Sequence, residues 1–286
     1  MTAGQTREPV LMPAPRADEA SAPSPRMDRA RVTLRWLEPA LVVLALLAAW
    51  EFLSRTGVLS KEDFPPVTAI ASSFFDDIRT AALWDGVSAS IGAWLVGMAI
   101  VIAVAIPAGL LLGASSLAYR ASHFTLEFIR TIPSIAALPL LMFLYGVSFQ
   151  LTLILVVLTA LWPLLIQTMY GMHDVDPVTR DTGKAYGLGR FRRLAVIDIP
   201  SCTPYMATGL RISGILGLIL AIGASLIAGG KGLGALIAQA ANNGDTELLY
   251  ARLFLTSALG LVVTYGLIRL ERRALRWHPS QRETAL

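Results

Sequence analysis

The sequence DTGKAYGLGRFRRLAVIDIP, residues 181–200, decides how this chain can be arranged. It is polar and basic, and it lies between two long apolar runs. In a chain that is otherwise apolar enough to be embedded in a membrane, such a segment is where a soluble partner can be met. We therefore expect residues 181–200, called the polar segment below, to be the functional centre.

The composition is that of a membrane protein. Of the 286 residues, 55% are hydrophobic and only 15% are charged, which is far from the average of soluble domains. The formal net charge is +4, but the basic residues cluster at the ends of apolar runs, which indicates membrane topology rather than nucleic-acid binding. Cys202 is the single cysteine, which excludes an intrachain disulfide, and the three histidines are too scattered to indicate a metal site.

The chain begins with a segment that cannot form a core. Residues 1–30 contain five prolines among Ala, Ser, Arg and acidic residues, and we expect a disordered cytoplasmic tail. Residues 37–53 are apolar and follow several arginines, so they predict an uncleaved signal anchor, with a cleaved signal peptide as the alternative. Residues 67–80 carry apolar side chains at steps of three and four, which predicts a short amphipathic helix outside the membrane.

Long uncharged runs predict the remaining membrane spans. Residues 86–119 form 34 uncharged residues in a row, and residues 131–172 form 42, whereas one crossing needs about 20. The second run is long enough for two crossings with a turn at residues 145–148, and residues 231–250 are expected to be a connection. The sequence thus predicts an all-α membrane protein with six transmembrane helices, at residues 37–53, 91–113, 131–145, 149–170, 205–229 and 252–269. Arg252 and Arg269, at the ends of the last span, are expected to extend outward to the membrane interface.

Small residues recur at every fourth position of the predicted fifth span. This spacing makes one helical face nearly smooth, so that another backbone can approach it. The face is interpreted either as ordinary helix packing within one bundle or as the lining of a pathway or a subunit seam. It consists of Gly209, Ser213, Gly217, Ala221 and Ser225.

The distribution of Lys and Arg predicts the orientation. With six spans, both termini lie on one side, and that side receives eighteen Lys and Arg residues against five on the other. By the positive-inside rule, the termini and the loop 172–202 are cytoplasmic, in a multi-pass protein of the inner membrane.

Within the loop, residues 178–186 after Pro177 predict a short helix, and Gly187 and Gly189 would let it stop and turn. The arginines at 190, 192 and 193 are interpreted equally as contacts to anionic headgroups or to a protein partner.

The spacing of the polar segment resembles the cytoplasmic loop motif of ATP-binding-cassette importer permeases. That motif is Glu-Ala-Ala, three residues, Gly, nine residues, Ile, one residue, Leu-Pro, and Gly187, Ile197 and Pro200 match its spacing without a gap. Asp181-Thr182-Gly183 replaces Glu-Ala-Ala, and Ile199 replaces Leu. Gly183 is expected to loosen the helix by up to ~1 kcal/mol relative to Ala.

Further pieces resemble the nitrate, sulfonate and taurine branch of this family: residues 64–67, residues 130–146 and residues 171–177. The resemblance implies a type I ABC importer permease-like fold over residues 31–286, with a short cytoplasmic coupling helix. It also implies a second permease copy, most simply a homodimer, ATP-hydrolysing subunits, a periplasmic or lipid-anchored solute-binding protein, and a small organic or inorganic anion as substrate. The residues that would couple to the ATPase are Asp181, Gly183, Ala185, Tyr186, Gly187, Gly189, Ile197 and Pro200.

Other classes of function are less consistent with the sequence. The predicted spans lack His and Asp, which an intramembrane enzyme or proton relay would use, and no Gly-Lys-Ser/Thr phosphate loop occurs. We expect a transport subunit that is not itself an enzyme, has no catalytic or metal-binding residues, and binds no cofactor, since ATP would be used by the partner. Membrane lipids are expected partners and nucleic acid is not. The alternative is a secondary carrier or channel that works without an ATPase.

Overall fold

The structure is a computed structural model that describes the backbone of residues 29–276 and the side chains of residues 41–276. The predicted disordered tail lies outside the described residues, except for residues 29 and 30, which belong to α1 (Arg29–Arg55). The chain divides into two units, Met1–Trp50 and Glu51–Leu286. All regular elements of the described residues are helical, which agrees with the predicted all-α class.

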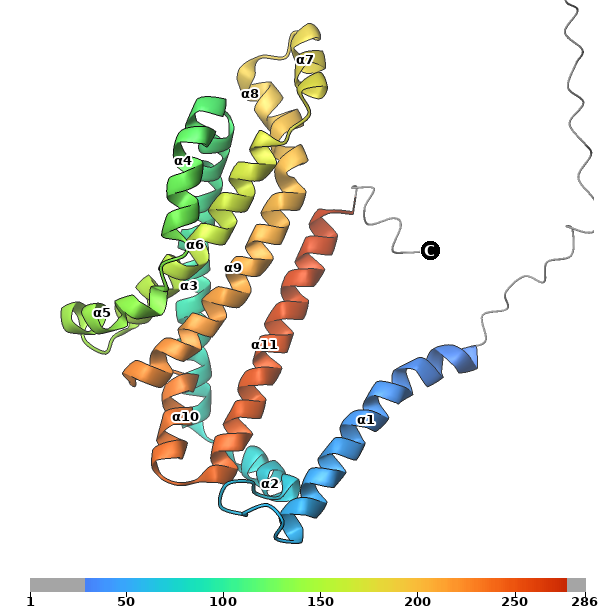
Figure 1. The fold of residues 1–286 in the computed structure, drawn as a ribbon, viewed down its shortest axis with the longest axis vertical. Helices are drawn as coiled ribbons and strands as arrows, with labels where there is room; N and C mark the ends of the chain where they lie inside the picture. The colour runs from blue at the N-terminus through green and yellow to red at the C-terminus, as the bar shows by residue number, and fades with distance from the viewer. Residues whose placement is uncertain (1–28, 277–286) are drawn as a thin grey trace, which may run out of the picture. The chain divides into compact units, whose positions relative to one another are not determined.

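The last turn of α1 belongs to the second unit, and the rest of that unit is a series of helices (Figure 1). In chain order they are α2 (Val67–Asp77), α3 (Ala81–Gly113), α4 (Ser116–Ile129), the 3-10 turn η2 (Ser134–Ala137), α5 (Leu138–Tyr145), α6 (Phe149–His173), α7 (Pro177–Ala185), α8 (Arg190–Arg193), the π-helical turn η3 (Leu194–Asp198), α9 (Ile199–Ala228), α10 (Leu233–Asn242) and α11 (Thr246–Ala274).

Helix α6 is the centre of the second unit, because it packs against both α3 and α9. Val101 and Ala105 of α3 are fully buried against Leu164 of α6. The two backbones come close at Gly109, where an added Cβ would lie 2.8 Å from the carbonyl oxygen of Leu165. A larger residue at 109 would therefore force the helices apart.

The smooth face of the fifth predicted span lies inside the bundle. Gly209, Ser213, Gly217, Ala221 and Ser225 are all buried in α9. A Cβ added at Gly209 would lie 3.2 Å from the Cα of Leu164 in α6, so this residue allows close helix contact. Within one chain these residues pack against neighbouring helices, and Ala221 also lines a cavity together with Ser90 and Thr152, so both interpretations of this face stay predictions.

The number of membrane spans follows only partly from the described residues. Four helical stretches are long and apolar enough to cross a membrane, namely Ala81–Gly113, Phe149–His173, Arg190–Asn242 and Thr246–Ala274. A fifth arises if α4 and the helical stretch Ser134–Tyr145, which are bent by 68° at their junction, are one broken span. The first predicted span, residues 37–53, falls within α1, whose side chains are described only from residue 41. Six spans therefore stay a prediction.

Residues 131–145 differ from the single straight helix that was expected. Pro133 has no N–H and disfavours helical geometry at Ile132, and the Thr131 hydroxyl donates to the carbonyl of Phe128 at 2.7 Å, at the end of α4. The helical residues here are therefore η2 and α5, and the preceding residues form α4. The turn at residues 145–148 is confirmed: Gly146 has φ 64°, and the Ser148 side chain accepts the N–H of Leu151 to begin α6.

The helix expected at residues 67–80 is confirmed as α2, which covers Val67–Asp77. The expectation that Arg252 extends outward to the membrane interface was wrong. Its guanidinium is buried and binds both carboxylate oxygens of Asp77 on α2, with Nε to Oδ2 at 3.0 Å and Nη2 to Oδ1 at 3.1 Å. The Nη1 atom donates to the carbonyl of Leu236 at 2.6 Å. Leu236 lies in α10, a helix within the expected connection 231–250. A buried arginine is stable only when paired, and this pair fastens α2 to α10 and α11.

Candidate functional site

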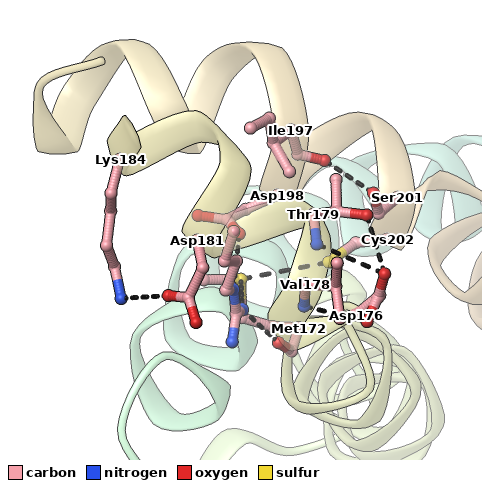
Figure 2. A network of polar contacts seen from close by, with 11 residues as sticks. Met172, Asp176, Val178, Thr179, Asp181, Lys184, Ile197, Asp198, Ser201 and Cys202 are labelled. Atoms are coloured by element: carbon pink, nitrogen blue, oxygen red, sulfur yellow. Dashed lines mark hydrogen bonds and ion pairs between the residues drawn. The ribbon is translucent and has the colours of Figure 1, made fainter. Parts of the chain in front are cut away.

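The short helix predicted in the loop 172–202 is present as α7, and Asp176 starts it. The Asp176 carboxylate accepts the backbone N–H of Val178 at 3.0 Å and that of Thr179 at 3.2 Å, while Pro177 occupies the first turn (Figure 2). It also accepts the Thr179 hydroxyl at 2.9 Å. The Thr179 hydroxyl and then these backbone donors hold the pKa of Asp176 below its ordinary value of 3.8, because they favour the ionised form. Asp176 is thus an N-cap that is strongest when charged.

The end of α7 is fixed by Gly187. This residue has φ 72°, a conformation that glycine adopts without strain. The N–H of Gly187 donates to the carbonyl of Lys184 at 2.9 Å, and that of Leu188 donates to the carbonyl of Gly183 at 3.0 Å. These two bonds form a Schellman motif, which satisfies the last carbonyls and reverses the chain.

A partly buried ion pair attaches α7 to the membrane helices. The Nε atom of Arg180 donates to Oδ1 of Asp198 at 2.8 Å, and its Nη2 atom donates to the carbonyl of Met172 at 2.7 Å. Asp198 is buried in η3, directly before α9, and Met172 lies in the last turn of α6. Arg180 therefore links α7 to both helices that enter and leave the loop.

Apolar contacts make the same connection. Met172, Val175 and Cys202 form a small buried cluster, against which Ile197 packs. Gly183 is buried, and a Cβ added there would lie 2.6 Å from Cδ1 of Ile197. Besides the loosening of α7 that was expected, the missing side chain of Gly183 lets α7 approach η3 closely.

Three large apolar side chains of the loop 172–202 are highly exposed. Val178 is 71% exposed, Tyr186 is 82% exposed and Phe191 is 89% exposed. Ala185 and Gly187, which flank Tyr186 in the chain, are exposed too. We call Val178, Tyr186 and Phe191 the apolar tip. Exposed aromatic side chains on a rigidly held loop are typical of a protein-binding surface.

The structure brings most of the sequence-predicted site residues into this loop. Ile197 lies within η3, and Pro200 lies in the first turn of α9. Asp181 is exposed and pairs with Lys184 at 2.7 Å, as Figure 2 shows, and Gly189 begins α8 with an ordinary φ of −61°. Two residues of the connection were missed, Arg180 and Asp198. A signal for Asp198 was present, because an acid between Ile197 and Ile199 in an apolar run has to find a partner.

Within the part of the chain that the structure describes, no group of three or more His, Cys, Asp or Glu side chains lies together as metal ligands would. Cys202, the one thiol, is buried with its Sγ 4.0 Å from Sδ of Met172. The loop offers a capped helix, a pair that fixes it and an exposed apolar tip.

Comparison with known proteins agrees with the resemblance. The chain is 26% identical over 250 residues to a permease protein of Escherichia coli named for aliphatic sulfonates transport, covering 86% of this chain and 95% of that protein. It is 24% identical to the taurine transport system permease protein of Escherichia coli, over 87% of this chain and 94% of that protein. It is 28% identical to the nitrate import permease protein of Synechocystis, over 82% and 88% of the two chains.

The fold is also found among solved structures. A chain of the inward-facing MetNI methionine ABC transporter matches with a TM-score of 0.59 at 17% identity, over 68% of this chain and 96% of that chain. At this identity the likeness concerns the fold, which is that of a type I ABC importer permease. A family model for the inner membrane component of binding-protein-dependent transport systems matches residues 105–276, a range that includes the whole loop 172–202. On this match, the chain belongs to the family of binding-protein-dependent transport system inner membrane components.

Proposed function

We propose that this chain is the permease subunit of an importer that takes up a small organic or inorganic anion, with ATP hydrolysed by a separate subunit that binds the loop 172–202. The observation that carries the proposal is the apolar tip on a loop fixed to α6 and α9. An importer also requires a second permease copy and an external solute-binding protein, both of which are part of the proposal.

The exposure of the apolar tip favours the view that a partner protein covers it, instead of its remaining exposed to water. Tyr186 and Phe191 are exposed by more than four fifths, at 82% and 89%, and burying aromatic side chains of this size contributes strongly to protein association. Asp181 and Lys184 pair with each other at 2.7 Å, whereas the exposed Arg190 and Arg192 flank Phe191 in the chain.

The link through Arg180 supports a coupling role. A partner that moves α7 also pulls on Met172 and Asp198, since both are bonded to Arg180. These residues lie at the ends of α6 and η3, and η3 continues directly into α9. Motion of an ATPase could thus be passed to α6 and α9 without a flexible joint between them.

The substrate class is inferred from the relatives. The names of the similar permeases refer to aliphatic sulfonates, taurine and nitrate, which share an oxyanion group. We propose an anion of this kind, selected mainly by the external binding protein.

A crosslinking experiment tests the position of the partner. Ala185→Cys in a Cys202→Ala background, co-expressed with the ATPase subunit, is expected to crosslink to that subunit. The matched control is Asn243→Cys, an exposed residue at the end of α10. Crosslinking from position 243 and none from position 185 would overturn both the proposed orientation and the docking site.

Substitution of the tip tests the contact itself. Tyr186→Ala and Phe191→Ala remove exposed side chains, so we expect insertion of the chain to be unchanged while co-purification of the ATPase falls. Phe75→Ala is the control, because Phe75 on α2 is 58% exposed. Transport by the purified chain without any partner would instead establish the carrier alternative.

A further inference from the structure

The second unit contains a cavity at the bend between α4 and α5. Its volume is about 490 Å³, and it is lined by residues of the bend, of α6 and of α9, a size at the lower end of small-molecule sites. Its polar lining residues are Arg130, Thr131, Ser134, Thr159, Gln167 and Tyr170. None of them belongs to the loop 172–202.

Two prolines lie at this cavity. Pro133 and Pro163 both line it: the first separates α4 from η2, and the second lies inside α6. Non-helical backbone at membrane depth is tolerated only where protein buries it or where it lines a water-filled cavity. The bend between α4 and α5 lines this cavity with backbone that is not α-helical, and in membrane transporters interrupted helices of this kind often form ligand sites.

Two side chains of the cavity have hydrogen-bonding capacity to spare. Thr159 Oγ1 is buried without a hydrogen-bond partner among the residues that the structure describes, although a serine or threonine hydroxyl in a helix can ordinarily donate to a carbonyl of the preceding turn. Arg130 pairs with Glu127 at 2.8 Å through Nη2, and its side chain is 52% exposed. A guanidinium has five N–H donors, so this pair leaves donors available to a ligand.

We infer that this cavity binds an organic oxyanion of the sulfonate type, with the oxyanion held by Arg130 and Thr159 and the carbon chain against the apolar wall. The inference rests on the proposed function and adds a location to it. Planar guanidinium groups and hydroxyls donate to oxyanions. The apolar wall is formed by Ile132, Trp162, Ile166, Ile212 and Leu216.

Glu127 determines how tightly such a ligand is held. Its Oε2 accepts from Arg130 and its Oε1 accepts the Tyr170 hydroxyl at 2.5 Å, so the arginine is already neutralised before a ligand binds. An oxyanion is then held by hydrogen bonds rather than by net charge. This suits a passage site, because a site that bound too strongly would not release its cargo.

Quenching of tryptophan fluorescence tests the inference on the full chain in phosphatidylcholine nanodiscs. The probe is 4-nitrobenzenesulfonate, whose nitroaryl group quenches indole emission, and butanesulfonate is the competitor. We expect saturable quenching that Trp162→Phe removes and that Trp84→Phe, at an exposed position, retains. Nitrobenzene, which lacks the oxyanion, should not quench saturably.

Variants of the polar residues locate the head group. Arg130→Gln should weaken probe binding by roughly tenfold or more, and Thr159→Val by about threefold to tenfold. Thr152→Val, two turns earlier on α6, is the matched control and should bind as the wild type does. Equal binding by all three variants would overturn the inference.

Two further measurements guard against misfolding and against lipid. Ser134→Cys in a Cys202→Ala background should react with N-ethylmaleimide and be protected by butanesulfonate; labelling without protection would count against the site. An anionic lipid also carries an oxyanion, so loss of probe binding when phosphatidylglycerol replaces half of the phosphatidylcholine would assign the cavity to lipid and overturn the inference.

The inference and the proposed function can fail separately. If ATP-dependent uptake of sulfonate by the complete importer is unaffected by Arg130→Gln and Thr159→Val, the cavity is not the passage site and the importer function stands. If the wild-type protein takes up sulfonate without ATP and these variants abolish that uptake, the site stands and the importer function fails.

Discussion

Removing the carboxylate of Asp77 should destabilise the second unit more than removing any exposed charged side chain. Arg252 and Asp77 are 8% and 7% exposed and are joined by two hydrogen bonds of 3.0 and 3.1 Å. Deleting one partner of a buried pair leaves an uncompensated charge and costs about 3–5 kcal/mol. For Asp77→Ala we therefore expect the apparent Tm to fall on the order of 10 °C.

The assay is thermal unfolding of the full chain purified in one detergent. Asp76→Ala is the matched control, since Asp76 and its partner Arg79 are both 79% exposed and lie 3.8 Å apart. Such an exposed pair contributes about 0–1 kcal/mol. The control should therefore unfold within a few degrees of the wild type.

A double variant separates the lost interaction from the charge that remains. Asp77→Leu combined with Arg252→Met replaces the pair by apolar side chains, which in buried sites is often neutral or stabilising. We expect the double variant to recover most of the stability lost by Asp77→Ala. The reasoning is refuted if Asp77→Ala unfolds within about 2 °C of the control, a difference that corresponds to less than 1 kcal/mol. It is also refuted if the double variant is no more stable than Asp77→Ala.

Three other changes give predictions of known sign. Gly187→Ala, at φ 72°, should destabilise the loop by about 1–2 kcal/mol and reduce ATPase co-purification, whereas Gly189→Ala, at φ −61°, should not destabilise the loop. The pKa of Asp176 is lowered in the folded protein, so its capping contribution is complete above pH 3.8, the ordinary pKa, and is lost as the pH falls through the pKa of the folded state. Hydrogen exchange of the α7 amides should therefore become faster in acid. Asp176→Asn should abolish this pH dependence while keeping the cap. Gly109→Leu should lower the apparent Tm, because its Cβ would lie 2.8 Å from a carbonyl of α6 and overpacking costs about 1–3 kcal/mol; Gly92→Ala, with open space around it, should not lower it.

Much of the loop was predictable because its signals are local. Asp176, Pro177 and Gly187 determine where α7 begins and ends through their own backbone and side-chain chemistry, and the sequence shows all of them. The same holds for α2 and for the turn at residues 145–148. The link between Arg180 and Asp198 was not predicted, because the two residues are 18 positions apart in the chain and only the folded loop brings them together.

The sequence by itself determined the class of this protein: long uncharged runs demand membrane helices, and the spacing of Gly187, Ile197 and Pro200 indicates the family. Only the tertiary structure decided the direction in which side chains point. Arg252 pairs inside the protein instead of reaching the interface, the small residues of α9 pack inward, and the bend at Pro133 opens a cavity beside Thr159. The physical reason is that hydropathy and spacing depend on neighbours along the chain, whereas burial and pairing depend on helices that are distant in sequence.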